Sequence, residues 1–395
     1  MNVAYAYEYP ADDIEVRSGH PRFILDQLQK RAEVRRVFPL DRRSRYRFAP
    51  KALFHRLTGR TYRPDREPAL LQSYARQISR AVGNGQVDCV FAPDSTVLTC
   101  LDTDIPKVFC ADATFANVVD AYDEYRNCAP SYADMAHAQE AQALATCSAA
   151  IYPSVWAAQS AIDHYGAAPE KVHVLPFGAN VSVPPRRSVD LAIERRRFNP
   201  MRLLFIGREW RRKGADIVLE ACRIARRSGV RLTVDIVGLE QTPEALPSFV
   251  RNHGALRKSD PVEKRRLEEL LAEAHLLFVP SRAENFGIAF SEAAAYGVPS
   301  LASDVGGIPT VVRDDVSGYA LPAGSSPEHY ASVIRDCAQD TGRYRELAHS
   351  SRHFYERHLS WDLFGERLMA IVGAAGAAGA GHASPHDQLV AEAAG

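Results

Sequence analysis

The chain has 395 residues, of which 46% are apolar and 24% are charged. That length and composition are typical of a globular protein with two domains of ordinary size, each able to bury its own core. Because 48 Lys and Arg balance 48 Asp and Glu, the net charge gives no indication of a nucleic-acid partner.

The cysteines and the first residues indicate the compartment. Seven cysteines are spread along the chain without a Cys-x-x-Cys or Cys/His cluster, which favours a reducing environment. The opening residues, MNVAYAYEYP, lack the charged n-region of a secretory signal peptide. No apolar run approaches the roughly 18 residues that a membrane-spanning helix needs. We therefore expect a cytoplasmic protein that is soluble or, at most, peripheral at the inner face of the membrane.

The chain opens with a strand, a glycine-containing loop and a helix. Residues 2–7 are predicted to form the strand, Ser18–Gly19–His20–Pro21 the loop, and residues 23–28 have the apolar spacing of a helix. A doubly wound α/β domain begins in this way, and its ligands bind beside the loops that follow its strands. Gly19 is therefore a candidate binding residue, although a turn without a ligand would have the same sequence.

A basic stretch follows the second expected strand, at residues 34–40. Residues 30–80 contain fifteen Lys or Arg against four Asp or Glu, and aromatic residues alternate with the arginines. Such alternation occurs in nucleic-acid-binding proteins, but a solvated basic face with its aromatics folded inward is the favoured interpretation. A third interpretation, which fits better than nucleic acid, is a basic surface that contacts an anionic lipid head group or a phosphorylated substrate.

The rest of the first half alternates helices and strands and places Asp112 at the carboxyl end of a strand. Residues 105–110 form that strand. Asp112 is thus a candidate ligand-contacting residue, and the alternative is that it caps the next helix. The other expected elements are helices at 70–81, 136–147 and 155–165 and strands at 86–92, 149–153 and 171–176.

A second βα half begins after residues 181–200, whose arginines and prolines suit a linker or a connecting helix. A strand at 202–206 leads into the cationic loop GREWRRKG, and a helix at 215–228 follows. Arg208 and Lys213 bracket this loop.

These two cations can reach a diphosphate from opposite sides, Arg208 as a bidentate donor and Lys213 as a point charge. The arginines between them, Arg211 and Arg212, are expected to be solvated.

The stretch LLFVPSRAENFGIAFSEAAAYGVP, residues 276–299, supplies two carboxylates at the same kind of position. A buried strand at 276–279 is followed by a polar loop with Glu284, by a turn at Phe286–Gly287 and by a helix that carries Glu292. Glu284 therefore lies at the carboxyl end of a strand, where ligands bind in open parallel sheets.

Two carboxylates beside a helix N-terminus suit a ligand with both hydroxyls and phosphates. The carboxylates accept hydrogen bonds from hydroxyls, while backbone N–H groups near Gly287 and Ile288 and the loop cations hold the phosphates. A nucleotide sugar has this chemistry. The alternative is a surface loop glutamate and a solvated helix glutamate. The motifs of dinucleotide oxidoreductases and P-loop NTPases, G-x-G-x-x-G and G-x4-G-K-[ST], are absent.

Glu284-x7-Glu292, inside PSRAENFGIAFSEAAAYGVPSLASDVGGIP, resembles the signature of the retaining family 4 glycosyltransferases, which have the GT-B fold. The resemblance is dense over residues 201–322, looser over 172–180 and faint in the first hundred residues. It implies an α/β protein of two Rossmann-like, doubly wound domains facing a central cleft, with a C-terminal helix that crosses back to the first domain. The expected parts are an acceptor-side domain at 1–180 with the crossover helix at 358–372, a linker at 181–200, a nucleotide-sugar-binding domain at 201–357 and a disordered tail at 373–395.

The resemblance also implies residue roles. The implied donor-binding residues are Gly19, Gly207, Arg208, Lys213, Glu284, Asn285, Phe286, Gly287, Ile288 and Glu292. The implied catalytic residues are Glu284, Arg208, Lys213 and Asp112. Family members commonly have a histidine where Asp112 stands and a glutamate where Thr310 stands, so Asp112 is interpreted as a replacement and Thr310 as a tolerated variation. No metal or other cofactor is implied.

The predicted function is the transfer, with retention, of a hexose-type sugar from a UDP- or GDP-linked donor to an unidentified acceptor. The acceptor hydroxyl belongs to a sugar, a lipid-linked glycan or a small molecule, in glycan, glycolipid or glycosylated-metabolite biosynthesis. A pyridoxal-type phosphorylase would need a Schiff-base lysine, which we cannot locate, and epimerases of this fold lack the Arg-x4-Lys and Glu-x7-Glu combination. The alternative from another class is a non-catalytic nucleotide-sugar-binding subunit of GT-B fold. Nucleic acid is not an expected partner, and peripheral contact with an anionic membrane is one of the interpretations left open for residues 30–80.

Overall fold

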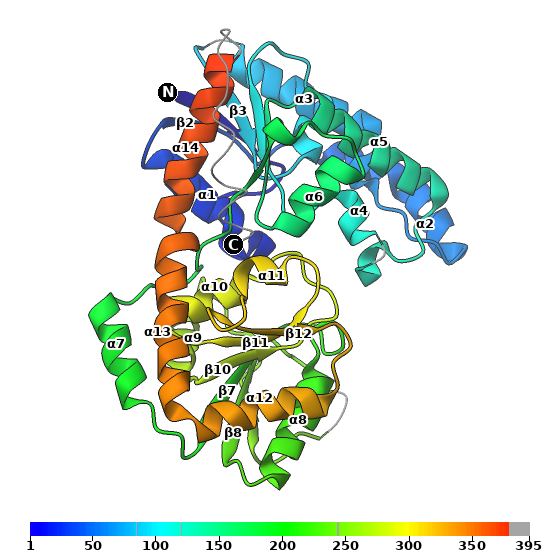
Figure 1. Cartoon of the computed structure of the whole chain (residues 1–395). Helices are drawn as coiled ribbons and strands as arrows, with labels where there is room; N and C mark the ends of the chain where they lie inside the picture. The colour runs from blue at the N-terminus through cyan, green and yellow to red at the C-terminus, as the bar shows by residue number, and fades with distance from the viewer. Residues whose placement is uncertain (84, 120, 243–244, 379–395) are drawn as a thin grey trace. The chain divides into compact units, whose positions relative to one another are not determined.

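The structure is a computed structural model that describes residues 1–83, 85–119, 121–242 and 245–378. These residues form two compact units (Figure 1). Unit 1 runs from Met1 to Pro176 and includes the chain again from Phe364, and unit 2 comprises Phe177–Leu363. The disordered tail expected at 373–395 is wrong for residues 373–378, because these residues belong to helix α14 (Trp361–Ala378). Val372 and Ala375 are buried in this last part, so apolar packing sustains the helix. Residues 379–395 lie outside the described residues.

Unit 1 contains a parallel sheet of six strands in the order β2-β1-β3-β4-β5-β6. The strands are β1 (Asn2–Ala6), β2 (Glu33–Val37), β3 (Cys89–Ala92), β4 (Lys107–Cys110), β5 (Ala149–Tyr152) and β6 (Val172–Val174). All residues of β3, β4 and β5 are buried, as expected for short strands that are covered on both faces by helices. The order of the strands reverses between β1 and β3, which makes the gap between their carboxyl ends the switch point of this sheet.

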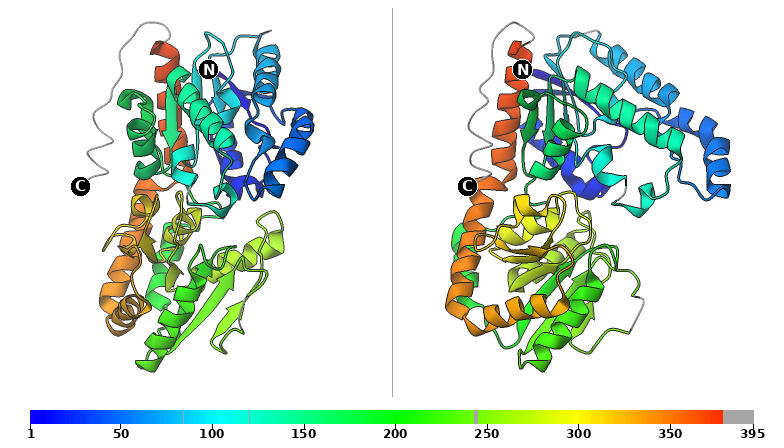
Figure 2. Two further views of the ribbon diagram at one scale, coloured as in Figure 1. Left: turned by 90° about the vertical axis from the view of Figure 1, so that its right-hand side faces the viewer. Right: turned by 45° about the vertical axis from the view of Figure 1, so that its right-hand side comes forward.

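Helices flank this sheet in unit 1 (Figures 1 and 2). They are α1 (His20–Gln29), α2 (Ala49–Leu57), α3 (Pro68–Val82), α4 (Phe115–Val118), α5 (Pro130–Thr146), α6 (Val155–Asp163) and the part of α14 from Phe364. Close packing joins α14 to α1, since a Cβ on Gly365 would lie 2.6 Å from Gln27 Oε1. The predicted crossover of the last helix to the first domain is therefore confirmed.

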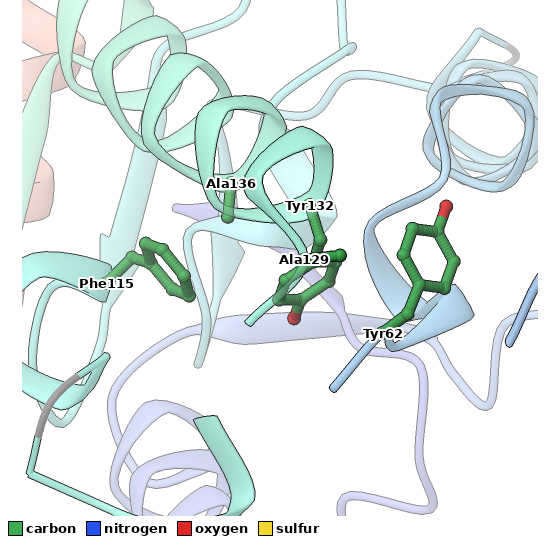
Figure 3. Close-up of a cluster of buried hydrophobic side chains, with 5 residues drawn as sticks. All are labelled: Tyr62, Phe115, Ala129, Tyr132 and Ala136. Atoms are coloured by element: carbon green, nitrogen blue, oxygen red, sulfur yellow. The ribbon is translucent and has the colours of Figure 1, made fainter. Parts of the chain in front are cut away.

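An apolar cluster fixes the basic segment of unit 1 against its helices (Figure 3). It consists of Tyr62, Phe115, Ala129, Tyr132 and Ala136. The Tyr62 and Tyr132 rings meet edge to face at a centroid distance of 5.6 Å, and Phe115 meets Tyr132 in the same way at 6.1 Å. The aromatics of this part of the basic stretch are thus folded inward.

Unit 2 contains a second parallel sheet of six strands, in the order β12-β11-β10-β7-β8-β9. The strands are β7 (Met201–Ile206), β8 (Leu232–Val237), β9 (Val250–Asn252), β10 (Leu276–Val279), β11 (Ser300–Asp304) and β12 (Gly318–Pro322). Counted within the unit, this is the order 3-2-1-4-5-6 of a Rossmann domain, so the switch point lies between β7 and β10. The prediction of two Rossmann-like α/β domains is confirmed.

The helices of unit 2 include two that position the candidate site, α8 (Ala215–Arg227) after β7 and α10 (Ile288–Ala295) after β10. The others are α7 (Arg186–Arg195), α9 (Pro261–Glu273), α11 (Ile308–Val311), α12 (Pro327–Gln339) and α13 (Thr341–His358). Strand β9 and helices α2 and α11 were not predicted. No helix in the described ranges is long and apolar enough to cross a bilayer.

Candidate functional site

The loop after β7 folds tightly because glycines occupy its two crowded positions. A Cβ on Gly207 would lie 2.8 Å from Cγ of Lys213, so glycine lets the lysine stem lie over the end of the strand. Gly214 has a φ of +77° and precedes α8, and a Cβ there would lie 2.1 Å from the carbonyl oxygen of Pro280. The β7–α8 loop therefore packs directly against the loop that follows β10.

This packing brings together two of the predicted residues, Lys213 and Glu284. The Lys213 ammonium forms an ion pair with the Glu284 carboxylate, and the Ser281 hydroxyl lies 3.4 Å from Oε2 of the same carboxylate. The two side chains are only 15% and 10% exposed, so water screens their attraction less than it screens a surface pair. A lysine and a glutamate thus meet across the switch point of the sheet, where a ligand is expected.

The other predicted cation of this loop, Arg208, is exposed. Within the described part of the chain its guanidinium makes no hydrogen bond or ion pair, which leaves its donors open to a ligand.

Arg212 was expected to be solvated, and this expectation is wrong. Its guanidinium pairs with Glu209 and donates a 3.0 Å hydrogen bond to the carbonyl oxygen of Ala283, next to Glu284. In return, Arg282 makes two 2.8 Å hydrogen bonds to the carboxylate of Asp216 at the start of α8. Arginines from both sides therefore link the β7–α8 loop to the loop after β10. The spacing of charges in the sequence does not predict these contacts.

The Glu284 backbone is fixed by the turn at Gly306–Gly307. The Gly307 N–H donates a 3.1 Å hydrogen bond to the Glu284 carbonyl oxygen. A Cβ on Gly306, which has a φ of +56°, would lie 2.0 Å from that same oxygen, so only glycine allows this approach.

The predicted turn into α10 presents polar groups beside Glu284. Gly287 has a φ of +87° and begins the helix, and Ile288 is its first residue. Phe286 is buried against Phe177, with ring centroids 5.5 Å apart. The buried Oδ1 of Asn285 has no hydrogen-bond partner among the described residues, so it can accept a hydrogen bond from a bound molecule.

Glu292, on α10, lies almost fully buried and pairs with Lys258. The Lys258 side chain is 17% exposed and comes from the loop between β9 and α9. Sequence reasoning missed Lys258, because its loop follows a strand that was not predicted. Unit 2 thus contains two Lys–Glu pairs, Lys213–Glu284 and Lys258–Glu292.

Unit 1 has its own ion pair at its switch point. Arg17, in the loop after β1, lies 2.6 Å from the carboxylate of Asp94, in the loop after β3. Arg17, Ser18 and the predicted Gly19 all have positive φ, at +45°, +58° and +89°, so this loop adopts a tight left-handed turn before α1. Neither Arg17 nor Asp94 was singled out from the sequence, because their proximity depends on the strand order.

Asp112 lies in the loop after β4, as predicted, and does not cap the next helix. Thr114 is the N-cap of α4, in a capping box with Asn117. Asp112 instead lies 3.5 Å from Nε2 of His20, the buried first residue of α1. Burial lowers the pKa of His20, and its Nδ1 lies 2.8 Å from the Arg17 carbonyl oxygen, which can only accept a hydrogen bond. A histidine therefore accompanies Asp112, supplied by the first turn of α1.

Two further carboxylates in this region of unit 1 are shielded from water. Glu140, 1% exposed, accepts a 3.1 Å hydrogen bond from the Ser95 hydroxyl, and Arg66 lies 3.8 Å away. Burial raises the pKa of Glu140 to about 7, while the Arg66 charge opposes the shift. Burial likewise raises the pKa of Glu8, and the nearby Asp94 adds to the shift.

The chemistry available in unit 2 is that of an anion beside a polyhydroxylated group. Arg208, Lys213 and the start of α10 offer positive charge and N–H donors, whereas Glu284, Glu292 and Asn285 offer oxygen acceptors. Among the described residues, no three His, Cys, Asp or Glu side chains are grouped as a metal site would require.

Two family models match the chain, one in each half. The model described as "Glycosyltransferase Family 4" matches residues 22–183, and the model described as "Glycosyl transferases group 1" matches residues 190–354. A D-inositol 3-phosphate glycosyltransferase of Catenulispora acidiphila is 34% identical over 221 residues, which are 52% of each chain. The chain thus spans about half the length of the curated relatives it matches.

Solved structures share the fold over nearly the whole length. A glycosyltransferase from Rickettsia africae aligns over 95% of this chain and 98% of its own, with a TM-score of 0.64 at 14% identity. HepE of Anabaena, solved in complex with UDP-glucose, aligns over 95% of this chain and all of its own, with a TM-score of 0.61 at 15% identity. At such identities the likeness shows the fold, which is the predicted GT-B fold.

Proposed function

Because the chain belongs to the family 4, or group 1, glycosyltransferases, we propose that it transfers a hexose-type sugar from a nucleoside diphosphate sugar to an acceptor hydroxyl, with retention of configuration. The observation that carries this proposal is the partly buried Lys213–Glu284 pair at the switch point of unit 2. It places a diphosphate-binding cation next to a hydroxyl-binding carboxylate, and the donor needs both.

The donor diphosphate would lie between Arg208, Lys213 and the N-terminus of α10. Negative charge builds on the β-phosphate oxygen as the glycosidic bond breaks, and these groups would stabilise that charge in place of a metal ion. The guanidinium of Arg208 is open for this role, and Lys213, whose ammonium has three N–H donors, can bind the diphosphate while it stays paired with Glu284. Removing one such stabilising group typically costs about 2.7–4 kcal/mol of barrier.

The sugar and the ribose would each be held by one carboxylate. Glu284 accepts hydrogen bonds from sugar hydroxyls and orients the anomeric carbon, with Asn285 Oδ1 as a further acceptor. Glu292 accepts from the ribose hydroxyls, and its ion pair with Lys258 holds that carboxylate in position. Gly207, Phe286 and Gly287 shape the walls of the proposed donor site through close packing. Gly19 and Asp112 belong to the other unit, the proposed acceptor-side unit.

The donor base and the acceptor are proposed at the level of class. A UDP- or GDP-linked hexose fits the site, and UDP-sugars come first because a fold neighbour is solved with UDP-glucose. The name of the curated relatives makes D-inositol 3-phosphate one acceptor to include beside sugars and lipid-linked glycans. Asp112, at the position where the family commonly has a histidine, also keeps a non-catalytic nucleotide-sugar-binding subunit as the second candidate.

A binding and turnover panel tests the proposal. The wild type and Arg208→Gln would be compared with UDP-, GDP- and ADP-sugars, first by thermal shift and then by nucleotide release with mixed acceptors. We expect one nucleotide class to stabilise the wild type and to be turned over, with turnover reduced by about 10²–10³-fold in the variant. Stabilisation without turnover would favour the binding subunit, and no stabilisation by any nucleotide sugar would contradict the site assignment.

A further inference from the structure

Helix α2 exposes an unusual apolar face at the edge of unit 1, near the start of α5 (Figures 1 and 2). None of its nine residues is buried. Leu53, Phe54 and Leu57 are 57%, 62% and 78% exposed, and Tyr46, in the 3-10 helix η2 (Arg43–Phe48) that leads into α2, is 65% exposed. We call these four residues the α2 face. Leu53 and Leu57 are one turn apart, so they lie side by side on the helix.

The α2 face points outward because the opposite side of the helix is anchored. Ala52 packs against the apolar cluster around Tyr62, and the His55 ring stacks on the Tyr62 ring at 4.9 Å with an angle of 15° between the planes. Lys51 lies 4.5 Å above the same ring and pairs with Glu67. The helix is therefore held in place without using its large apolar side chains.

The surroundings of the α2 face are strongly basic. Residues 42–64 contain eight Lys or Arg and no Asp or Glu. Among them Arg47, Arg56 and Arg60 are exposed, and their guanidinium groups pair with no carboxylate in the described ranges. Large apolar side chains that are exposed to water are unfavourable, and the unpaired arginines beside them can bind anions. We therefore expect a partner that covers the apolar side chains and carries negative charge.

We propose that the α2 face docks peripherally on a bilayer that contains anionic lipids. Leu53, Phe54, Leu57 and the Tyr46 ring enter the boundary between head groups and acyl chains, and the arginines bind lipid phosphates. A free polyphosphate or a nucleic acid would explain the arginines but not the exposed leucines. A second copy of this basic surface would bring like charges together. The proposal does not rest on the transferase activity.

Vesicle co-sedimentation of the full chain tests this docking. Vesicles of phosphatidylcholine alone would be compared with vesicles that also contain phosphatidylglycerol. We expect binding to the anionic vesicles only, and loss of that binding near 1 M salt, where charges are screened beyond about 3 Å. The same binding to both vesicle types, or no binding to either, would overturn the proposal.

Variants separate the two contributions to docking. L53S/F54S/L57S and R47Q/R56Q/R60Q should each weaken binding on the order of a hundredfold. The matched control is L191S/V262S, which removes exposed apolar side chains from unit 2 and should leave binding unchanged. The thermal unfolding midpoint of each variant checks that it folds. An equal loss of vesicle binding in the control would contradict a specific docking face. If light scattering shows that the wild type is a dimer and that L53S/F54S/L57S is a monomer, the α2 face binds a second copy of the chain and the bilayer proposal is wrong.

Discussion

The approach of Gly306 to Glu284 offers a sharp prediction about how the candidate site is held. Gly306→Ala would place a Cβ 2.0 Å from the Glu284 carbonyl oxygen. Real Cβ contacts are rarely shorter than 3.0 Å, so the backbone of Glu284 must move by about 1 Å. Glu284 would then no longer lie where it pairs with Lys213 and where the sugar is proposed to bind.

Two costs follow from this change, and they differ in kind. The positive φ of +56° costs any L side chain about 1–2 kcal/mol of stability. A displacement of about 1 Å in a catalytic group costs about 10²-fold in rate. We therefore expect nucleotide release from the donor to fall about a hundredfold, while the free energy of unfolding falls by about 1–2 kcal/mol or somewhat more.

Gly166→Ala is the matched control for Gly306→Ala. Gly166 has a similar φ of +66°, but a Cβ there meets nothing within 4 Å. The control should lose about the same stability from strain and keep the wild-type rate. Initial rates and denaturant unfolding of both variants provide the comparison. Gly306→Ala with a rate within a few-fold of Gly166→Ala would refute the argument that this turn positions Glu284.

Three further predictions follow from the other contacts. Lys258→Met should raise KM for the nucleotide sugar about tenfold or more with little change in kcat, because Glu292 loses a charged hydrogen-bond partner. An unchanged KM would argue against the proposal that Glu292 binds the ribose. Glu140→Gln should stabilise the protein at pH 8 but not at pH 4.5. The wild-type carboxyl has a pKa of about 7 in the folded state and 4.5 in the unfolded state, so its ionisation lowers the free energy of unfolding by up to about 3 kcal/mol as pH rises through this range. Unfolding curves of Glu140→Gln that are shifted from those of the wild type equally at both pH values would contradict this. Nucleotide release should persist after EDTA treatment, since Arg208 and Lys213 are proposed to neutralise the diphosphate, and activity that returns only with added Mg²⁺ would overturn that role.

The fold could be predicted well where strands are short apolar runs between helices. The strands at 105–110, 149–153 and 276–279 were found because buried parallel strands read as continuous apolar segments. Strand β9 and helix α2 were missed because neither has a clear apolar pattern. Strand β9 has only three residues, and α2 has no buried residue to mark a core-facing side. Residues 358–372 were predicted as one crossover element, whereas α13 ends at His358 and α14 starts at Trp361.

The candidate site could be predicted only where its residues follow recognisable strands. Lys213 and Glu284 both come after such strands, and the strand order brings the two ends together. Lys258 and the Arg17–Asp94 pair depend on which strands are neighbours, information that no local pattern contains. Arg212 looked like its neighbours in the sequence, and only the packing of two loops distinguishes its structural role.

Donor turnover by a Glu284 variant tests the central claim most directly. Nucleotide release from the preferred nucleotide sugar would be measured for the wild type, for Glu284→Gln and for the control Glu269→Gln, which changes an exposed glutamate on α9. The account predicts wild-type release by Glu269→Gln and a reduction of about tenfold to a hundredfold by Glu284→Gln, the loss expected for hydrogen bonds to a charged group. Release by Glu284→Gln at the wild-type rate, with the donor still bound, would contradict the assignment of this carboxylate to the reacting sugar.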